Sequence, residues 1–456
     1  MKRFVYLIFF VIPNLVFAEN LETQIELASN PINLDELLTQ SIDNQFEITV
    51  QNTEVPQASC KGNCQLANQI QLTQNGISPN MITMPGPYCV ITDLTVPAFQ
   101  NGIFINTSNV ILDLNNRIIM SANGANFTSL TGIVVNSNLS NITIRNGTIV
   151  NLGGNGILIN PGCRQIILEN IKFLNNLNGM QLLGVRTCRI QNCLSSFNRN
   201  DGFLIGSING SFSQNFLIRN CISSFNAFDG FQLTSCFNCD LVDCFSFSNQ
   251  ANGFDQTLGR QINFNGCQAL SNVREGFIST GNNHNFDQCQ SNDNRLDGFL
   301  IDGNQQTITN CQAKANRTNG FMVRSNNNSL QNCIADANTQ IGFIINGNSH
   351  VLENCEAKSN ATGFQITNNN HCLLNNLAKN NTAIGFSLLA ASNRCQVRSN
   401  TAVANSTGIQ NSTTTVNRIY SNFSSDNTTA NFVGVPNVIV SPSAVAAINF
   451  TANISN

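Results

Sequence analysis

The chain has 456 residues, of which only 10% are charged, and its net charge at pH 7 is −3. Soluble domains ordinarily carry about 25% charged residues. Nucleic-acid binding needs a basic surface that neutralises phosphates, and this chain has no basic cluster to supply one. Nucleic acid is therefore excluded as a partner, and Asn, Ser and Thr take the place of charge.

The N-terminus predicts export. Lys2 and Arg3 precede a short apolar run, and Ala18 is a small residue suited to cleavage before Glu19. The run is interrupted by Pro13 and is shorter than the ~20 residues that cross a bilayer. We expect residues 1–18 to be a signal peptide. The mature protein would then have no membrane span and would be secreted, periplasmic or on the cell surface.

A glycine followed by an apolar residue recurs about every 23 residues through the middle of the chain. These glycines are Gly156, Gly179, Gly202, Gly230, Gly253, Gly276, Gly298, Gly320, Gly342, Gly363, Gly385 and Gly408. A period of this size is typical of a solenoid, because a single repeat cannot bury its own apolar face. The apolar segments, such as "GFLI" and "GFQI", are short and lie between polar turns, which predicts strands and not helices.

Two further columns keep the same period. Four residues before a glycine stand Asn198, Asn226, Asn249, Asn272, Asn294, Asn316, Asn338 and Asn381, and three before it stand Asn360 and Asn405. Thirteen or fourteen residues after a glycine stand Cys193, Cys244, Cys267, Cys289, Cys311, Cys333 and Cys355, with Cys221 displaced by an insertion. The first column predicts an internal Asn ladder at a turn. The second predicts buried thiols, because stacked side chains point the same way and not at each other.

The segments "VILDLNNRII", "NITIRNGTI" and "GGNGILI", followed by repeats with "DGF", resemble the right-handed parallel β-helix repeat family of the pectin-lyase-like superfamily. The resemblance covers about Ile91 to Gln410. It implies an all-β, single-stranded right-handed parallel β-helix with coils of 22–23 residues. The family contains polysaccharide lyases, hydrolases and epimerases, phage tailspikes and adhesins, so the resemblance leaves the activity open.

The ends of the chain leave the period, as solenoid ends do. We expect an N-terminal cap region over residues 19–90, with a short capping helix from Asn33, because Glu36 follows three residues later. The β-helix is expected over residues 91–410. Residues 411–456 are expected to form an irregular C-terminal cap or tail.

The coil from Gly202 to Gly230 is 28 residues long, about five more than its neighbours, and the extra residues fall within "GSINGSFSQ". Six cysteines are disulfide candidates: Cys60 with Cys64 in "CKGNC", Cys163 with Cys188, and Cys236 with Cys239. The first pair could instead be a redox or metal pair. The other two pairs are predicted to brace the inserted loop, which makes this coil the most probable place for a localised function.

The position before each glycine collects carboxylates and amides. Candidate catalytic residues are Asp201, Asp229, Glu275 and Asp297, with Arg199 and Arg295 beside them. Paired carboxylates can flank a scissile glycosidic bond, or hold Ca²⁺ against a uronate while a base removes a proton. The alternative is that these are ordinary turn residues and that the arginines beside them form weak surface ion pairs. Ca²⁺ is the cofactor expected if the protein is a lyase, and the sequence indicates no other.

His350 and His371 occupy the same place on consecutive coils, eight residues after the glycine. They could share a metal ion, or they could be polar occupants of a turn like the amides found there in other coils. The chain has no Trp and 3 Tyr, and the Phe residues of "SSFN", Phe197 and Phe225, are expected inside the coil. Few aromatic faces are therefore available for sugar.

Three functions remain open. The first is a secreted or cell-surface β-helix protein that binds a polysaccharide or a host or envelope surface. The second is a polysaccharide lyase, hydrolase or epimerase acting along the Asp201 to Asp297 face. The third is a passive structural envelope protein. An enzyme predicts a groove beside the inserted loop with two carboxylates and a base, whereas a surface of amides and hydroxyls there favours binding.

Overall fold

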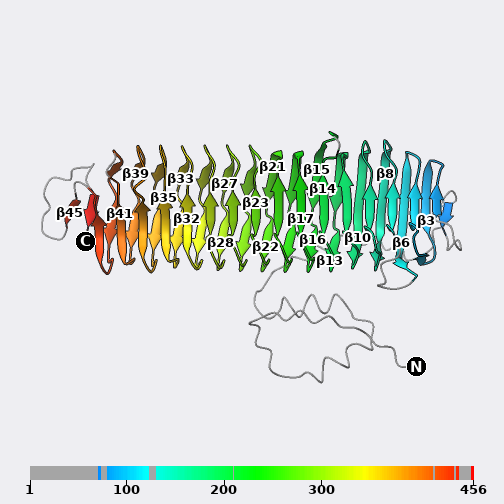
Figure 1. Cartoon of the computed structure of the whole chain (residues 1–456), viewed down its shortest axis with the longest axis horizontal. Helices are drawn as coiled ribbons and strands as arrows, with labels where there is room; N and C mark the ends of the chain where they lie inside the picture. Colours follow the sequence, from blue (N-terminus) through cyan, green and yellow to red (C-terminus); the bar gives the residue numbers. More distant parts are fainter. Residues whose placement is uncertain are drawn as a thin grey trace, which may run out of the picture. The chain divides into compact units, whose positions relative to one another are not determined.

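The computed structural model describes residues 70–72, 80–122, 130–208, 210–413, 416–435, 438–440 and 453–455. The chain divides into a unit of residues 1–63 and a unit of residues 64–456, and all described residues belong to the second. The predicted signal peptide, the capping helix from Asn33, and Cys60 and Cys64 lie outside the described residues. The regular elements of the described part are all strands. They follow one another in chain order along one axis (Figure 1).

Each coil has three faces, and the strands that begin with the Gly-apolar segment form face 1. Its sixteen strands are β2 (Asn80–Ile82), β5 (Ile103–Ile105), β7 (Ile133–Val135), β9 (Ile157–Ile159), β11 (Met180–Leu183), β14 (Phe203–Gly206), β17 (Phe231–Thr234), β20 (Phe254–Thr257), β23 (Phe277–Ser279), β26 (Phe299–Ile301), β29 (Phe321–Val323), β32 (Ile341–Ile345), β35 (Thr362–Ile366), β38 (Ile384–Leu388), β41 (Thr407–Asn411) and β44 (Ala430–Val433). Strands of consecutive coils pair in parallel along the whole of this face.

Face 2 follows face 1 in each coil. Its strands are β1 (Ile70–Leu72), β3 (Gly86–Val90), the first parts of β6 (Val110–Ser121), β8 (Ser140–Val150) and β10 (Arg164–Leu174), then β12 (Arg186–Gln191), β15 (Ser213–Arg219), β18 (Cys236–Val242), β21 (Arg260–Asn265), β24 (Asn285–Asp287), β27 (Thr307–Thr309), β30 (Ser329–Gln331), β33 (Val351–Glu353), β36 (Cys372–Leu374), β39 (Gln396–Arg398) and β42 (Arg418–Tyr420).

Face 3 completes the coil. Its strands are β4 (Leu94–Val96), the second parts of β6, β8 and β10, then β13 (Leu194–Ser196), β16 (Ile222–Ser224), β19 (Phe245–Phe247), β22 (Gln268–Leu270), β25 (Gln290–Asn292), β28 (Gln312–Lys314), β31 (Ile334–Asp336), β34 (Glu356–Lys358), β37 (Leu377–Lys379), β40 (Thr401–Val403) and β43 (Phe423–Ser425), with β45 (Val438–Val440) and β46 (Asn453–Ser455) at the C-terminal end. The predicted parallel β-helix is confirmed. Parallel pairing extends beyond the predicted span of 91–410 at both ends.

A column of phenylalanines fills the interior behind face 1. Its nine fully buried rings are Phe203, Phe231, Phe254, Phe277, Phe299, Phe321, Phe343, Phe364 and Phe386. Neighbouring rings stack with centroids 4.6–4.8 Å apart and planes within 9° of parallel. The distance between rings is set by the strand spacing of about 4.8 Å. One aromatic residue per coil therefore builds a continuous core.

The predicted Asn ladder is confirmed at the turn between face 3 and face 1. Asn316 is fully buried. Its backbone N–H and its Nδ2 both donate to Oδ1 of Asn338 in the next coil, at 3.0 and 2.9 Å. Nδ2 also donates to the carbonyl of Ser291, one coil earlier, at 2.9 Å. The ladder satisfies buried backbone groups that a bend would otherwise leave unpaired, each at a cost of about 1–3 kcal/mol.

The eight-cysteine column is also buried, and its members are free thiols, as predicted. Cys311 is typical, because its Sγ donates to the carbonyl of Thr309 in the same coil at 3.2 Å and lies 3.6 Å from the carbonyl of Phe286 in the previous coil. Burial raises the pKa of Cys267 and Cys333 well above the ordinary value. The thiols of Cys267 and Cys333 are therefore neutral packing groups and not nucleophiles.

The two disulfides predicted around the inserted loop are wrong, because Cys163, Cys188, Cys236 and Cys239 are all free. The residue opposite Cys188 in the previous coil is Ile166 and not Cys163. Cys236 and Cys239 lie on one strand, β18, and their thiols engage the backbone carbonyls of Thr234 and Phe237, at 3.7 and 3.4 Å. All four pack in the interior as small apolar groups.

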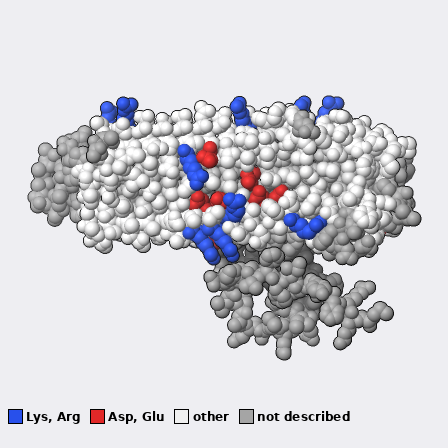
Figure 2. All heavy atoms as spheres, in the orientation of Figure 1, with Lys and Arg blue, Asp and Glu red and all other residues white. Residues whose placement is uncertain are grey.

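The outer surface carries few charges. Figure 2 shows acidic and basic residues together near the middle of the face in view, further Lys and Arg residues along its upper edge, and most of that face uncharged. The expectation that the "SSFN" phenylalanines point inward is wrong for Phe197, whose side chain is 48% exposed and stacks on Phe225 with ring centroids 5.1 Å apart. Both residues have positive φ, which turns them outward immediately before the Asn ladder.

The Phe column provides a test of the fold. Replacement of Phe299 by Ala removes a ring stacked on both sides, so we expect the free energy of unfolding to fall by about 3–5 kcal/mol. The matched control is Phe228→Ala, at a ring that is 54% exposed, with an expected change within about 0.5 kcal/mol. Urea unfolding followed by circular dichroism measures both. Equal losses in the two variants would contradict the packing described here.

Thiol accessibility tests the cysteine column. In the native protein we expect iodoacetamide to label Cys372, which is only half-buried, and to leave Cys311 and its column neighbours unmodified until denaturant is added. Peptide mass mapping identifies the labelled positions, and Cys372→Ala is the control. Native labelling of the column, or recovery of Cys163 joined to Cys188, would show that the interior is not packed in this way.

Candidate functional site

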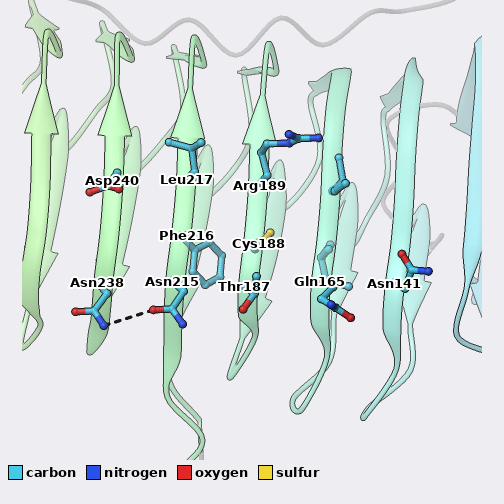
Figure 3. Close-up of a pocket in the computed structure, with 12 residues that line it drawn as sticks. Asn141, Gln165, Thr187, Cys188, Arg189, Asn215, Phe216, Leu217, Asn238 and Asp240 are labelled. Carbon is cyan, nitrogen blue, oxygen red and sulfur yellow. Dashed lines mark hydrogen bonds between the residues drawn. The ribbon is translucent and has the colours of Figure 1, made fainter.

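An open groove of about 630 Å³ runs across face 2. It crosses five consecutive coils, from β8 through β10, β12 and β15 to β18. Its lining residues are Asn141, Gln165, Ile166, Ile167, Thr187, Cys188, Arg189, Asn215, Phe216, Leu217, Asn238 and Asp240. Figure 3 shows the amide and hydroxyl residues in one row, with Arg189, Leu217 and Asp240 in a second row further along the strands.

The first row exists because each strand bends at one residue. Gln165, Thr187, Asn215 and Asn238 all have φ between 52° and 61°. Asn populates this left-handed region more readily than most residues, because its short side chain bonds to nearby backbone. The bend turns each of these side chains into solvent beside the groove. Adjacent members are close enough to interact, and Asn238 Nδ2 donates to Asn215 Oδ1 at 3.4 Å.

The second row forms the floor and mixes apolar and charged side chains. Ile167, Arg189, Leu217 and Asp240 are in register on four consecutive coils. The guanidinium of Arg189 extends from β12 toward β10, and Asp240 lies at the other side of the groove (Figure 3). Asp240 accepts a hydrogen bond from Asn263 Nδ2 at 2.7 Å. Beneath the floor Cys188 and Phe216 are buried, and burial raises the pKa of the Cys188 thiol well above its ordinary value.

The inserted residues of the long coil lie between β14 and β15 and lead directly into the groove. Ile208 and Ser211 pair in an antiparallel bridge, which closes a tight turn. Phe212 packs edge-on against Phe237 with ring centroids 5.1 Å apart. Gly184 has a φ of +64°, and a Cβ there would lie 2.7 Å from the Ser211 side chain, so the loop sits tightly against the preceding coil.

The acidic residues predicted to act in catalysis lie elsewhere, in a row at the start of face 1. Asp201, Asp229, Glu275 and Asp297 are at most 7% exposed, so the side chains of these turn residues are buried. They form a second internal ladder. Asp201 Oδ1 accepts the backbone N–H of Asp229 at 3.0 Å, and Asp229 Oδ1 accepts that of Asn252 at 2.7 Å. Asp297 Oδ1 accepts the N–H of Asn319 at 3.0 Å.

Burial changes the acidity of this row. It raises the pKa of Asp201 to about 6 and that of Asp229 to about 7, and the carboxylate of Asp255 on the next coil adds to both. Burial also raises the pKa of Glu275, which the ion pair with Arg274, 3.7 Å away, opposes. Each of these carboxyls costs free energy when it ionises in the folded chain.

The arginines predicted to alternate with these acids do not converge on them. Nη2 of Arg199 donates to the carbonyls of Leu152 and Gly153, at 3.1 and 2.7 Å. Arg295 is exposed, and within the described ranges no ion pair joins it to a carboxylate. In the described part of the chain neither Arg199 nor Arg295 is therefore placed as a base beside these acids, and the Asp oxygens accept backbone N–H groups of the adjacent coil.

His350 and His371 stack with ring centroids 5.2 Å apart, but both nitrogens of each ring face the backbone. Nδ1 of His350 accepts the N–H of Asn328 at 3.1 Å and its Nε2 lies 2.6 Å from the carbonyl of Asn346. His371 repeats the arrangement with His350 and Thr367. Burial lowers the pKa of His371 to about 4. Both rings are thus neutral members of an internal ladder, without a lone pair available for a metal ion.

Among the residues that the structure describes, no three His, Cys, Asp or Glu side chains are grouped so that they could hold a metal ion. The same part of the chain contains no helical stretch with the length and hydropathy of a membrane span.

The sequence did not predict the groove residues, because the number of residues between the repeat glycine and the face 2 strand differs from coil to coil. Thr187 and Asn238 stand eight residues after a glycine, as His350 does. In their coils the face 1 strands β11 and β17 hold four residues, whereas β26 and β29 hold three. Every later position of these coils therefore lies one residue further from the glycine. As a result Cys188 and Cys239 point into the interior behind face 2, and Thr187 and Asn238 point outward.

Comparison with known proteins agrees with this architecture. Residues 70–212 and 275–424, more than half of the chain, match the family described as the right handed beta helix region. The chain belongs to this family, and its coil is accordingly right-handed. No curated protein sequence matches the chain closely enough to count as a relative.

Several solved structures are similar in fold. One is the A-module of the mannuronan C-5 epimerase AlgE6 of Azotobacter vinelandii, with 13% identity, a TM-score of 0.43, and coverage of 82% of this chain and 91% of that one. A second is the Dettilon tailspike protein gp208, with 12% identity, a TM-score of 0.38, and coverage of 66% of this chain and 59% of that one. A third is the catalytic domain of a GH87 α-1,3-glucanase, with 12% identity, a TM-score of 0.39, and coverage of 72% of this chain and 69% of that one. At this level the similarity concerns the fold alone.

The acid row predicts how stability depends on pH. Asp229 has a pKa of about 7 in the folded chain and about 3.9 when unfolded. The contribution of Asp229 to the free energy of unfolding is therefore fully present below pH ~4, declines as the pH rises toward 7 and is lost above pH 7. Asn fills the same position at Asn252 and accepts the same kind of hydrogen bond. We expect Asp229→Asn to raise the free energy of unfolding at pH 8 by on the order of 2–4 kcal/mol.

Urea unfolding at pH 4, 6 and 8 measures this effect, and the gain should shrink toward pH 4. The groups facing Asp229 are Asp201 and Asp255, which also carry negative charge when ionised. The control is Asp302→Asn at an exposed position, for which no pH-dependent gain is expected. A gain for Asp229→Asn that is the same at all three pH values would show that the carboxyl is not buried as described.

Proposed function

We propose that the protein is an exported β-helix protein that binds an extended polysaccharide in the face 2 groove without cleaving it. The observation that carries this proposal is the lining of the groove. One amide or hydroxyl side chain projects from each of five consecutive coils, from Asn141 to Asn238, beside a floor that contains Ile167 and Leu217. Export, in a mature form beginning near Glu19, is part of the proposal.

The repeat of the groove suits a polymer. Its polar side chains recur at the coil spacing of about 4.8 Å, which is similar to the length of one pyranose residue in a chain. Asn and Gln amides both donate and accept hydrogen bonds, as sugar hydroxyls do. Ile167 and Leu217 offer apolar contact to the C–H faces of the rings. Sites of this kind combine a concave apolar floor with a few placed polar groups.

The groove favours binding over turnover because its charged groups are too few for acid–base catalysis. Asp240 is its one carboxylate and Arg189 its one basic side chain, and they are two coils apart. Catalysis by general acid and base requires both groups within hydrogen-bond reach of the reacting atoms.

One observation favours the second candidate, a polysaccharide lyase, hydrolase or epimerase acting along Asp201 to Asp297. Asp201 and Asp229 have pKa values raised to about 6 and 7, close to those useful in general acid catalysis at neutral pH. Their oxygens, however, accept backbone N–H groups of the adjacent coil. A calcium-dependent lyase activity belongs to this candidate alone, and a passive structural role requires neither activity nor binding.

A binding experiment with one matched pair of variants tests the proposal. We expect Asn215→Lys to weaken binding of an oligosaccharide at least tenfold, because the longer charged side chain fills the groove. Asn327→Lys is the control, since Asn327 is also exposed with a φ of 59° but lies outside the groove. Glycan arrays identify the ligand, and calorimetry with the mature protein gives the affinities.

The same samples, with and without Ca²⁺, are assayed for new reducing or unsaturated ends. Binding that Asn215→Lys abolishes, without new ends, supports the proposal. New ends that disappear in Asp201→Asn would replace it by the enzymatic candidate. The absence of both binding and products would leave the structural role.

A further inference from the structure

The proposed function leaves the chemistry of the polysaccharide open, and the charges around the groove restrict it. We infer that the groove takes a heteropolysaccharide in which acidic sugars alternate with neutral ones, and that it rejects a uniformly anionic chain. The inference rests on the proposed function and concerns the same site. It follows from a group of arginines at one end of the groove and a carboxylate at the other.

The arginine group consists of Arg164, Arg186 and Arg189. Arg164 and Arg186 are exposed, in register on adjacent strands, and directly precede the lining residues Gln165 and Thr187. Arg189 lies on the floor, and its guanidinium extends toward β10, the strand of Arg164. Like charges directly opposite one another destabilise a sheet, so the fold alone does not account for this pairing.

In the part of the chain that the structure describes, no carboxylate forms an ion pair with these arginines. Arg145, on the neighbouring coil, is by contrast paired with Asp113 at 2.9 Å. Guanidinium groups bind planar or tetrahedral oxyanions through paired N–H donors. Arg164 and Arg186, which are register partners, and Arg189, three residues further along β12, are suited to bind oxyanion groups of a ligand, either carboxylate or sulfate.

The other end of the groove has the opposite charge. Asp240 is exposed on the floor, two coils beyond Arg189 in the same row. At about 4.8 Å per coil this places it about 10 Å further along the axis. Between them stands Leu217, which has no hydrogen-bonding side chain. A second acidic group on the ligand at Asp240 is repelled, whereas a neutral sugar can donate a hydroxyl hydrogen bond to the carboxylate.

The groove therefore has a direction. An acidic sugar lies over β10 and β12, and a neutral sugar lies over β18. A chain that alternates acidic and neutral units satisfies both ends, and a homopolymer of acidic units satisfies only one. A neutral homopolymer leaves the three arginines without an anion.

The test compares three octasaccharides by calorimetry against the mature protein: hyaluronan, which alternates carboxylate and neutral sugars; oligogalacturonate, in which every sugar is acidic; and a cello-oligosaccharide, which is neutral. We expect hyaluronan to bind at least tenfold more tightly than the other two. A keratan sulfate oligosaccharide, with sulfate in place of carboxylate, determines which oxyanion the arginines prefer, and tight binding of either alternating chain supports the inference.

Variants separate the two ends. The double variant Arg186→Gln/Arg189→Gln should lose at least tenfold in affinity for hyaluronan and should bind the neutral chain as before. Its matched control is Arg260→Gln, which shares the row of Arg186 three coils away but does not line the groove. Asp240→Asn should strengthen oligogalacturonate binding at least fivefold, because the variant removes the negative charge that repels a second acidic sugar.

Equal affinities for all three chains, with binding still lost in Asn215→Lys, would overturn the inference and leave the proposed function standing. Tighter binding of oligogalacturonate than of hyaluronan by the unmodified protein would also overturn it. If none of these chains binds but the glycan array yields another ligand whose binding Asn215→Lys abolishes, the inference fails and the proposed function stands; if the array yields no ligand either, the proposed function itself fails.

Discussion

The structure depends on one constraint, which is that the backbone N–H groups buried at the bends of a coil must be paired by a neighbouring coil. A parallel solenoid stacks identical backbone positions directly above one another, so a bend that leaves an N–H unpaired is repeated in every coil. Asn resolves this at the turn before face 1, because its Oδ1 accepts the N–H of the Asn in the preceding coil while its Nδ2 continues the ladder. The side chains thus carry hydrogen bonds where the sheets are interrupted.

The same constraint explains why residue types occur in columns. The position held by Cys193 through Cys355 passes to Asn376, whose Oδ1 accepts the N–H of Cys355 and whose own N–H is accepted by Asn400. Cysteine and asparagine serve the same bend, the first by packing and the second by hydrogen bonding. The internal His and the buried acids follow this rule as well, since Nδ1 of His350 and Oδ1 of Asp229 each accept a backbone N–H. Chemically reactive residue types are therefore used in this fold as structural acceptors.

The interior could be predicted from the sequence because the constraint acts there in every coil. The Phe, Asn and Cys columns each recur once per coil in the sequence, and their common period predicts the fold. The acids and the histidines share this repetition, but their residue types suggested chemistry. Their burial depends on how neighbouring coils close over them, which the spacing alone does not reveal. The disulfides around the inserted loop failed for a related reason, since Ile166 and not Cys163 lies opposite Cys188.

The groove could not be predicted because it lies outside, where the constraint does not act and no residue type is enforced. Its residues differ from coil to coil, as in Thr187, Asn215 and Asn238, and they share only a left-handed backbone conformation. An extra residue in the face 1 strands of these coils also shifts their spacing from the glycine. A coil of unusual length, from Gly202 to Gly230, was the one external signal in the sequence, and the groove indeed adjoins its inserted loop.

We propose that ligand binding belongs to the groove on face 2 and not to the acid row on face 1. Hydrogen–deuterium exchange of the mature protein with and without a bound oligosaccharide tests it directly. Slower exchange confined to the backbone of β10, β12, β15 and β18 is the predicted result. Protection centred on Asp201 to Asp297, with none at the groove, would contradict the account.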